Sequence, residues 1–291
     1  MEKNMKTCVS SYSFSKLYKK GELNQLTAMK KAKELGFDAF GFSSILPHDG
    51  STPIEYAKML RREADAMDFP IVSLVIPADL LNGRDGRSPD EEVEYVKSMV
   101  DIAEILGVKT MRHDATSALK RYKSFDAGLA ELAERINEIS EYARTKGIKT
   151  CVENHGYLCQ DPDRVERLFN AVKSDNFGLL CDIGNFLCVD ADPVRAVSLV
   201  APYAVFAHVK DFFIRSGALD APGQGYSKTR GGNYFRGTIL GHGVVPVKQC
   251  IRILKNAGYD GYLSLEFEGM EEPIEGITIG LANLKRFIAE I

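Results

Sequence analysis

The feature that most constrains the fold is a repeated order in which an apolar, strand-like segment is followed by an amphipathic helix. About eight such pairs follow one another along the chain. Pro in the first helical turn, as at Pro53 and Pro89, and Gly after the last turn, as at Gly36, mark helix ends. This alternation predicts a parallel sheet covered by helices. The expected strands are 6–12, 37–42, 70–76, 108–112, 148–153, 177–181, 205–209 and 262–266, and the expected helices are 21–35, 53–67, 88–107, 125–146, 161–173, one from 192, 247–257 and 274–291.

Eight pairs in 291 residues favour a closed (β/α)₈ TIM barrel, a fold that often occupies this length as one domain. We therefore expect a single domain over residues 1–291. A doubly wound open sheet is the alternative, but no G-x-G-x-x-G motif follows the first strand. Residues 211–245 are rich in Gly and basic residues, and we expect them to form a long irregular loop.

Composition excludes several classes of partner. The net charge is −3 and no Lys/Arg-rich run is present, so we expect no nucleic-acid partner. No apolar run is long enough to cross a bilayer, and the N-terminus lacks the apolar core of a signal peptide. The 6 cysteines form no C-x-x-C pair, which is typical of reduced thiols. The sequence thus predicts a cytoplasmic protein without a membrane partner.

Four successive strands of the predicted barrel end in a polar residue: Glu153, Asp182, His208 and Glu266. In such a barrel the C-terminal strand ends meet at one rim, where the chemistry takes place. A buried ionised carboxylate is costly unless it is paired or coordinated. Three carboxylates and one imidazole suit one divalent metal, with Mn²⁺ expected first and Mg²⁺, Co²⁺ or Zn²⁺ as alternatives.

Each of these residues taken alone has a more ordinary interpretation, because a strand-end Asp or Glu is usually a helix cap or a loop ion pair. Four on consecutive strands favour a site. Other polar residues nearby receive structural interpretations. Asp211 is expected to orient a neighbour, Glu268 to point away from Glu266, and the pair Tyr12 and Phe14 to belong to the core.

At these residues the chain resembles the sugar phosphate isomerase/epimerase superfamily, the xylose isomerase-like barrels. Within it, the chain is most similar to the ketose 3-epimerase, hydroxypyruvate isomerase and inosose isomerase/dehydratase groups. The resemblance covers nearly the whole chain. It rests on Val152-Glu153-Asn154-His155, Cys181-Asp182-Ile183-Gly184-Asn185, His208-Val209-Lys210-Asp211, Gly241-His242-Gly243 and Leu265-Glu266.

The resemblance implies that Glu153, Asp182, His208 and Glu266 bind one divalent metal, and that Glu153 and Glu266 also move the substrate proton. Such a metal polarises a carbonyl and its neighbouring hydroxyl when a proton leaves the adjacent carbon. The chain departs from the epimerases at Asn185, where they usually carry His, and at the second strand end, where Gly41 and Phe42 replace Glu. The candidate substrate-binding residues are Arg112, His113, His155, Asn185, Arg215 and His242.

The expected function is a metal-dependent sugar isomerase or epimerase that moves a proton at a carbon next to a carbonyl. The same site also supports a lyase or dehydratase acting on a keto-sugar, cyclitol or oxidised glycoside. An apurinic-site endonuclease is a minor alternative, because it needs more His ligands than the 5 histidines allow. The resemblance further implies a small carbohydrate substrate and a homo-oligomer, either a dimer or a tetramer.

Overall fold

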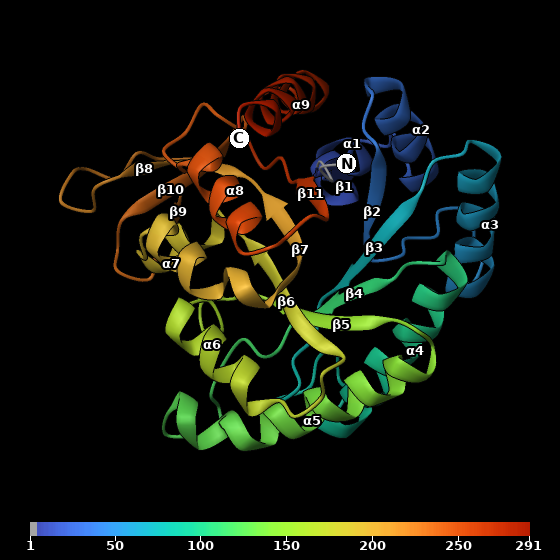
Figure 1. The fold of residues 1–291 in the computed structure, drawn as a ribbon, viewed down its shortest axis with the longest axis vertical. Helices are drawn as coiled ribbons and strands as arrows, with labels where there is room; N and C mark the ends of the chain where they lie inside the picture. The colour runs from blue at the N-terminus through green and yellow to red at the C-terminus, as the bar shows by residue number, and fades with distance from the viewer. Residues whose placement is uncertain (1–4) are drawn as a thin grey trace. The chain divides into compact units, whose positions relative to one another are not determined.

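The computed structural model describes residues 5–291, and its main sheet is a closed parallel barrel with the strand order β1-β11-β7-β6-β5-β4-β3-β2 (Figure 1). Each barrel strand is followed by at least one helix, so the predicted (β/α)₈ architecture is confirmed. The barrel strands are β1 (Lys6–Ser10), β2 (Ala39–Ser43), β3 (Ile71–Ile76), β4 (Thr110–His113), β5 (Lys149–Glu153), β6 (Phe177–Asp182), β7 (Ala204–Val209) and β11 (Tyr262–Leu265). The α-helices are α1 (Ser15–Lys19), α2 (Gln25–Leu35), α3 (Pro53–Ala66), α4 (Pro89–Leu106), α5 (Phe125–Thr145), α6 (Pro162–Ala171), α7 (Pro193–Val200), α8 (Val247–Asn256) and α9 (Pro273–Ala289), with short 3₁₀ turns at Ser11–Phe14, Asn185–Val189 and Ala201–Tyr203.

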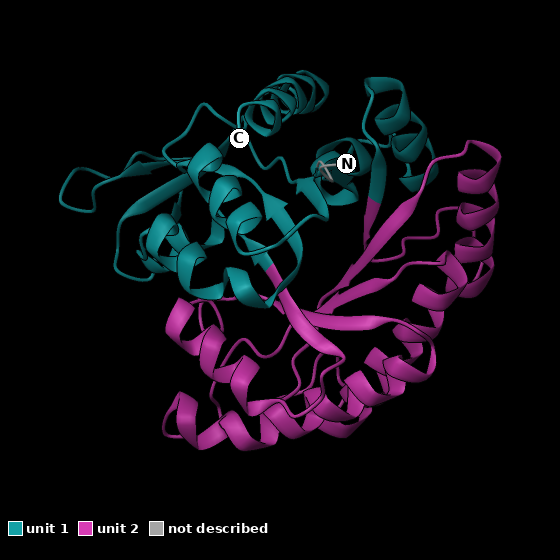
Figure 2. Cartoon of the chain, viewed as in Figure 1, with its two compact units in different colours: residues 1–40, 181–291 teal, residues 41–180 magenta. Residues whose placement is uncertain are grey.

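The chain contacts divide into two compact units (Figure 2). In residues 41–180, β3, β4 and β5 pair in parallel, with Met111 facing Leu74 on one side and Thr150 on the other. In the other unit, residues 181–291 with the N-terminal residues up to 40, β11 pairs in parallel with β1 and β7. The single-domain organisation stays a prediction.

Local sequence accounts for where the helices begin and end. Helix α4 starts after Ser88, whose hydroxyl accepts from the N–H of Glu91 while the Glu91 carboxylate accepts from the N–H of Ser88. It ends at Gly107, which adopts a left-handed conformation with φ of 73°. The expected helix from residue 21 begins later, at Gln25, because the Asn24 side chain caps it and accepts from the N–H of Thr27.

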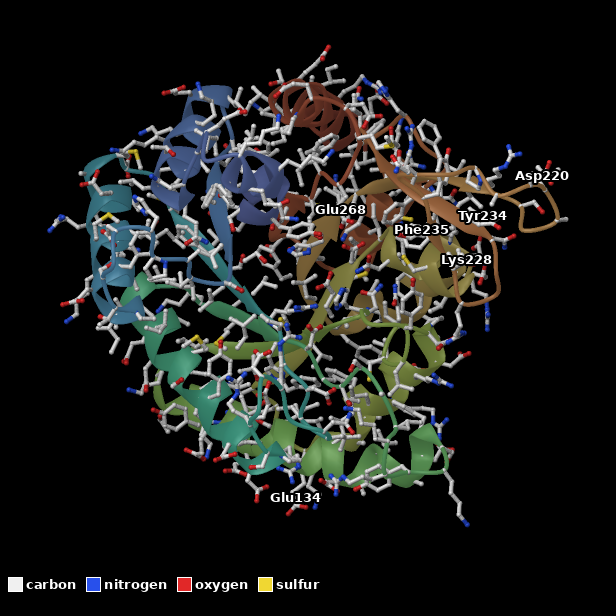
Figure 3. The ribbon with its side chains drawn as sticks, turned by 180° about the vertical axis from the view of Figure 1, so that it is seen from behind. Glu134, Asp220, Lys228, Tyr234, Phe235 and Glu268 are labelled. Atoms are coloured by element: carbon white, nitrogen blue, oxygen red, sulfur yellow. The ribbon has the colours of Figure 1, made fainter. Side chains whose placement is uncertain are left out.

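The prediction that residues 211–245 are irregular is wrong. They contain a three-stranded antiparallel sheet in the order β8-β10-β9, made of β8 (Asp211–Arg215), β9 (Ser227–Lys228) and β10 (Tyr234–Thr238). Phe212 and Phe235 pack edge to face across it, with ring centroids 5.3 Å apart. The Gly-rich connections hid these short strands in the sequence. In Figure 3, Asp220 marks the tip of the loop that joins β8 to β9.

Asp211 organises the segment that leads from this sheet to α8. Its buried carboxylate accepts from four backbone N–H groups, at 2.8–3.0 Å. This agrees with the orienting role expected for it. The donors are Phe212, Gly241, Gly243 and Val245.

We expect Asp211→Ala to lower the free energy of unfolding by at least about 3 kcal/mol, because each buried donor left without an acceptor costs about 1–3 kcal/mol. Equilibrium urea denaturation measures this loss. Asp220→Ala, an exposed carboxylate in the same unit, is the control and should change stability by less than about 0.5 kcal/mol. Equal stability of the two variants would contradict the anchoring role.

Within residues 5–291, no helix has both the length and the apolar character that a membrane span requires. The cysteine side chains are all buried free thiols. Burial raises the pKa of Cys8, Cys159 and Cys250 to about 12, so these thiols stay protonated and poorly reactive.

Candidate metal centre

Three of the four predicted metal ligands lie together in the unit that contains residues 181–291. Asp182 ends β6, His208 lies in β7, and Glu266 follows β11; all three are buried. Each offers a donor atom within 4.8 Å of the others. His208 Nδ1 lies 3.9 Å from Asp182 Oδ2 and 3.6 Å from Glu266 Oε1.

The backbone around this cluster holds the ligand side chains in place. Asp182 Oδ1 accepts from the N–H groups of Gly184 at 2.8 Å and Asn185 at 2.9 Å, while Oδ2 faces His208 and Lys210. The N–H of Glu266 donates to Val209 O at 3.0 Å, which ties the end of β11 to β7. The three residues combine two hard oxygen donors with an imidazole in a buried setting, and this donor set fits a divalent metal ion.

Lys210 is a component of this cluster that the sequence analysis did not identify. Its side chain is 5% exposed, and its ammonium lies 3.0 Å from Asp182 Oδ2 and 2.5 Å from Glu266 Oε2. It also donates to Glu268 Oε1 at 2.7 Å. Opposite charges this close offset part of the cost of burying an ammonium group. No local signal marked this residue, because a lysine just after a strand is usually exposed.

The expectation that Glu268 points away from the site is wrong, because its carboxylate meets Lys210. Strand β11 ends at Leu265, so the alternation of side chains along a strand no longer applies at Glu268. Of the pair expected in the core, Phe14 is fully buried, whereas 45% of Tyr12 is exposed. The charge of Glu268, burial and the charge of Glu266 raise the pKa of Tyr12.

Glu153 lies in the other unit, at the end of β5. Its Oε2 is 2.7 Å from the guanidinium of Arg112, and both side chains are nearly fully buried. Arg112 also donates to Asp114 Oδ1 at 2.6 Å and to Ile76 O at 3.3 Å. Two carboxylates therefore share one guanidinium, so Arg112 offsets one of their two negative charges and orients Glu153.

His155, a predicted substrate-binding residue, forms a pair with Asp114. Its Nδ1 lies 2.9 Å from Asp114 Oδ1, and about half of its side chain is exposed. Burial acts to lower the pKa of His155, but the hydrogen bond to Asp114 and the negative charge of that carboxylate outweigh it, so the net shift is upward. The pair therefore orients an imidazole that holds its proton to a higher pH than a free histidine.

We expect NMR titration to give His155 a pKa above 6.5, and Asp114→Asn to lower it. Because the folded-state pKa is raised, the stabilisation from this pair is fully present below about pH 6.5 and is lost as the pH rises through the raised value. His242 in the same spectra is the internal control and should not respond to Asp114→Asn. A His155 pKa that Asp114→Asn leaves unchanged would contradict the pairing.

The other predicted substrate-binding residues occupy different settings. His113 is fully buried, donates from Nδ1 to Asp114 O at 2.9 Å, and has a pKa that burial lowers to about 4, so it is neutral. Asn185 is buried, and its N–H holds Asp182. Arg215 is exposed, with Nε donating to Asp220 O at 3.1 Å, and His242 is exposed in the segment anchored by Asp211. Substrate contact by these residues stays a prediction.

The parallel barrel and the buried carboxylates and imidazole at its strand ends place this chain among (β/α)₈ proteins with a candidate metal centre. A family profile described as the xylose isomerase-like TIM barrel matches residues 29–287. The chain belongs to this family.

Known proteins similar to this chain include an inosose dehydratase from Glaesserella parasuis serovar 5 (strain SH0165), 26% identical over 225 residues that cover 71% of this chain and 73% of the relative. Among solved structures, the IolI protein with a bound zinc atom superposes with a TM-score of 0.75 at 17% identity, over 98% of this chain and 99% of the other. An L-ribulose 3-epimerase superposes with a TM-score of 0.72 at 14% identity, over 98% and 95%. At these identities the structural matches show the fold.

Proposed function

We propose that the protein is a divalent-metal-dependent dehydratase that removes water from a keto-cyclitol or keto-sugar. The observation that carries the proposal is the buried cluster of Asp182, His208 and Glu266, which presents metal-ligand chemistry at the strand ends of this fold. The similarity to an inosose dehydratase supports elimination as the reaction. It favours the alternative in our sequence analysis over the isomerase or epimerase expected first.

We further propose Glu153 as the fourth ligand. Strand β5 pairs in parallel with β6 so that Glu153 lies opposite Leu180, two residues before Asp182 in the same strand. A bound divalent ion would polarise a carbonyl and an adjacent hydroxyl of the substrate. Mn²⁺ is the first expectation for a site with three carboxylates and one histidine, with Mg²⁺, Co²⁺ and Zn²⁺ as alternatives.

The proposed residue roles follow from the proton movements of an elimination. A carboxylate, Glu153 or Glu266, takes the proton from the carbon next to the carbonyl. The hydroxyl on the β-carbon takes a proton from an acidic group and leaves as water. The products are one water molecule and a carbonyl compound with a new double bond between its α- and β-carbons. Arg112 pairs with Glu153, so this carboxylate has a fixed direction before substrate binds, and Lys210 pairs with Glu266 in the absence of metal.

An isomerase or epimerase acting on a ketose is the second candidate, because the same carboxylates could return the proton to carbon instead of completing elimination. The similarity in fold to an L-ribulose 3-epimerase agrees with this reading. A small carbohydrate is the proposed substrate in both cases, and a homo-oligomer is the proposed assembly.

Reaction in deuterated water separates these functions. Metal is removed from the protein with a chelator, and the protein is incubated with a keto-cyclitol or a ketohexose, with and without Mn²⁺, Mg²⁺, Co²⁺ or Zn²⁺. Mass spectrometry then gives the masses of the products. We expect metal-dependent loss of one water from the keto-cyclitol. Deuterium uptake without loss of water would instead establish the isomerase or epimerase. Absence of metal binding would overturn the proposed function.

A further inference from the structure

The ammonium of Lys210 occupies the acidic cluster where a metal ion would draw its ligands. It lies within 3.0 Å of Asp182, Glu266 and Glu268, and all of these contacts lie in one compact unit. Asp182 and Glu266 are candidate metal ligands, whereas Glu268 lies outside that set. The lysine therefore shares two of its three carboxylate partners with the proposed metal.

The summed charge of Lys210 and its three carboxylate partners is negative enough to be neutralised by a divalent cation. Three carboxylates and one ammonium carry a net charge of −2 when all are ionised. Burial makes such an excess unfavourable unless another cation neutralises it. Without the lysine the excess would be −3, and without Glu268 it would be −1. Lys210 and Glu268 thus adjust the local charge in opposite directions.

The surrounding backbone is shaped to seat this lysine and its third partner. A Cβ on Gly184 would lie 2.6 Å from Lys210 Cγ, so glycine at this position allows the lysine stem to pass. A Cβ on Gly237 in β10 would lie 2.6 Å from Glu268 O, so the added sheet packs directly against the Glu268 backbone. Glycine at these two positions therefore leaves room for the lysine stem and the Glu268 backbone beside the candidate ligands.

We propose that Lys210 is a resident counter-ion that competes with the divalent metal for Asp182 and Glu266 and thereby sets the metal affinity of the site. The inference rests on the proposed function, because it requires a cation to bind at Asp182, His208 and Glu266. In the absence of metal, Lys210 keeps these carboxylates from repelling one another. With metal bound, Glu268 retains the ammonium, and the lysine remains a positive charge close to the ion. Lys210 is a positioning residue in this role.

The test compares variants with the wild-type protein in two measurements on the full chain. Calorimetry after removal of metal gives the Mn²⁺ dissociation constant, and thermal unfolding in the presence of chelator gives the melting temperature. Lys210→Met is expected to bind Mn²⁺ at least about tenfold more tightly than wild type, since a unit charge a few ångströms away exerts at least this effect even with strong screening. Its melting temperature in chelator should fall. Lys210→Arg keeps the charge and should stay within about threefold of the wild-type dissociation constant.

Glu268→Gln provides the opposite test and is expected to weaken Mn²⁺ binding at least about tenfold. In this variant the charged partners of Lys210 in the cluster are Asp182 and Glu266, so the ammonium competes more strongly with the metal for them. The double variant Lys210→Met/Glu268→Gln restores the local charge and should return to within about threefold of wild type. Lys248→Met is the matched control, since Lys248 pairs with Glu290 at 2.5 Å on the surface of the same unit. It should leave the dissociation constant unchanged.

The possible failures are distinguishable. Wild-type protein that binds no Mn²⁺ would overturn the proposed function together with this inference. Wild-type binding combined with unchanged or weaker binding by Lys210→Met would overturn the inference alone. If Lys210→Met does not fold, unchanged Mn²⁺ binding by Glu268→Gln overturns the inference. If Lys210→Met folds, a double variant that binds Mn²⁺ as weakly as Glu268→Gln overturns it as well.

Discussion

Asp182→Asn is expected to weaken divalent metal binding by at least about 100-fold, because the loss of a ligand exceeds the effect of losing an outer hydrogen-bond partner. Asp182 is fully buried, and two backbone N–H groups fix its Oδ1. An asparagine oxygen can still accept these two bonds, so the loop after β6 keeps its conformation. Its amide nitrogen would then face Lys210 and His208, where a negatively charged oxygen is required. Calorimetry and metal analysis of the purified variant measure the loss.

The control for this substitution is Asp192→Asn, which makes the same chemical change at the exposed N-cap of α7. It should bind metal as wild type does and lose only capping energy of about 1 kcal/mol or less. Retention of one metal per chain by Asp182→Asn, at wild-type affinity, would show that Asp182 is not a ligand. That result would remove the central residue of the proposed centre.

Glu153→Gln is expected to reduce kcat by at least about 100-fold, the usual contribution of a positioned acid or base. Glutamine has the shape of glutamate but cannot accept a proton at neutral pH. The variant should remain folded, because the Arg112 guanidinium keeps the partly buried Asp114 as a partner at 2.6 Å. Turnover of the keto-cyclitol, or of whichever substrate the deuterium experiment identifies, gives kcat, and circular dichroism checks the fold.

Glu138→Gln serves as the matched control, since Glu138 is an exposed partner of Lys97 in the same compact unit as Glu153. It should preserve both kcat and metal binding. A Glu153→Gln variant with wild-type kcat would exclude Glu153 as the acid or base. If Glu153→Gln binds metal normally but loses turnover, Glu153 acts in proton transfer and is not required as a metal ligand.

Several features of the site could be predicted from sequence because they depend on local rules. Asp182 is a strand-end residue after an apolar run, and His208 lies near the end of another, so barrel topology directs both to one rim. Lys210 could not be assigned in this way. A lysine just after a strand is usually exposed, and only the positions of Asp182, Glu266 and Glu268 explain its burial.

The added sheet shows the same limit at the level of the fold. Its strands β8 and β10 are separated by 18 residues, and β9 has only two, so local patterns gave no clear strand signal. The pairing depends on antiparallel contacts across that separation and on the packing of Phe212 against Phe235. The direction of Glu268 was predicted wrongly for a related reason, since its carboxylate pairs with Lys210, which is far from it in the chain.

By itself, the sequence determined the barrel, the helix caps and the residue types at the strand ends, because periodicity and capping act over a few neighbouring residues. Tertiary structure decided that Lys210 enters the acidic cluster, that Glu268 pairs with it, and that Asp211 anchors residues 241–245. These contacts join residues that are far apart in the chain. Their geometry follows from how strands and loops pack, which a local pattern does not encode.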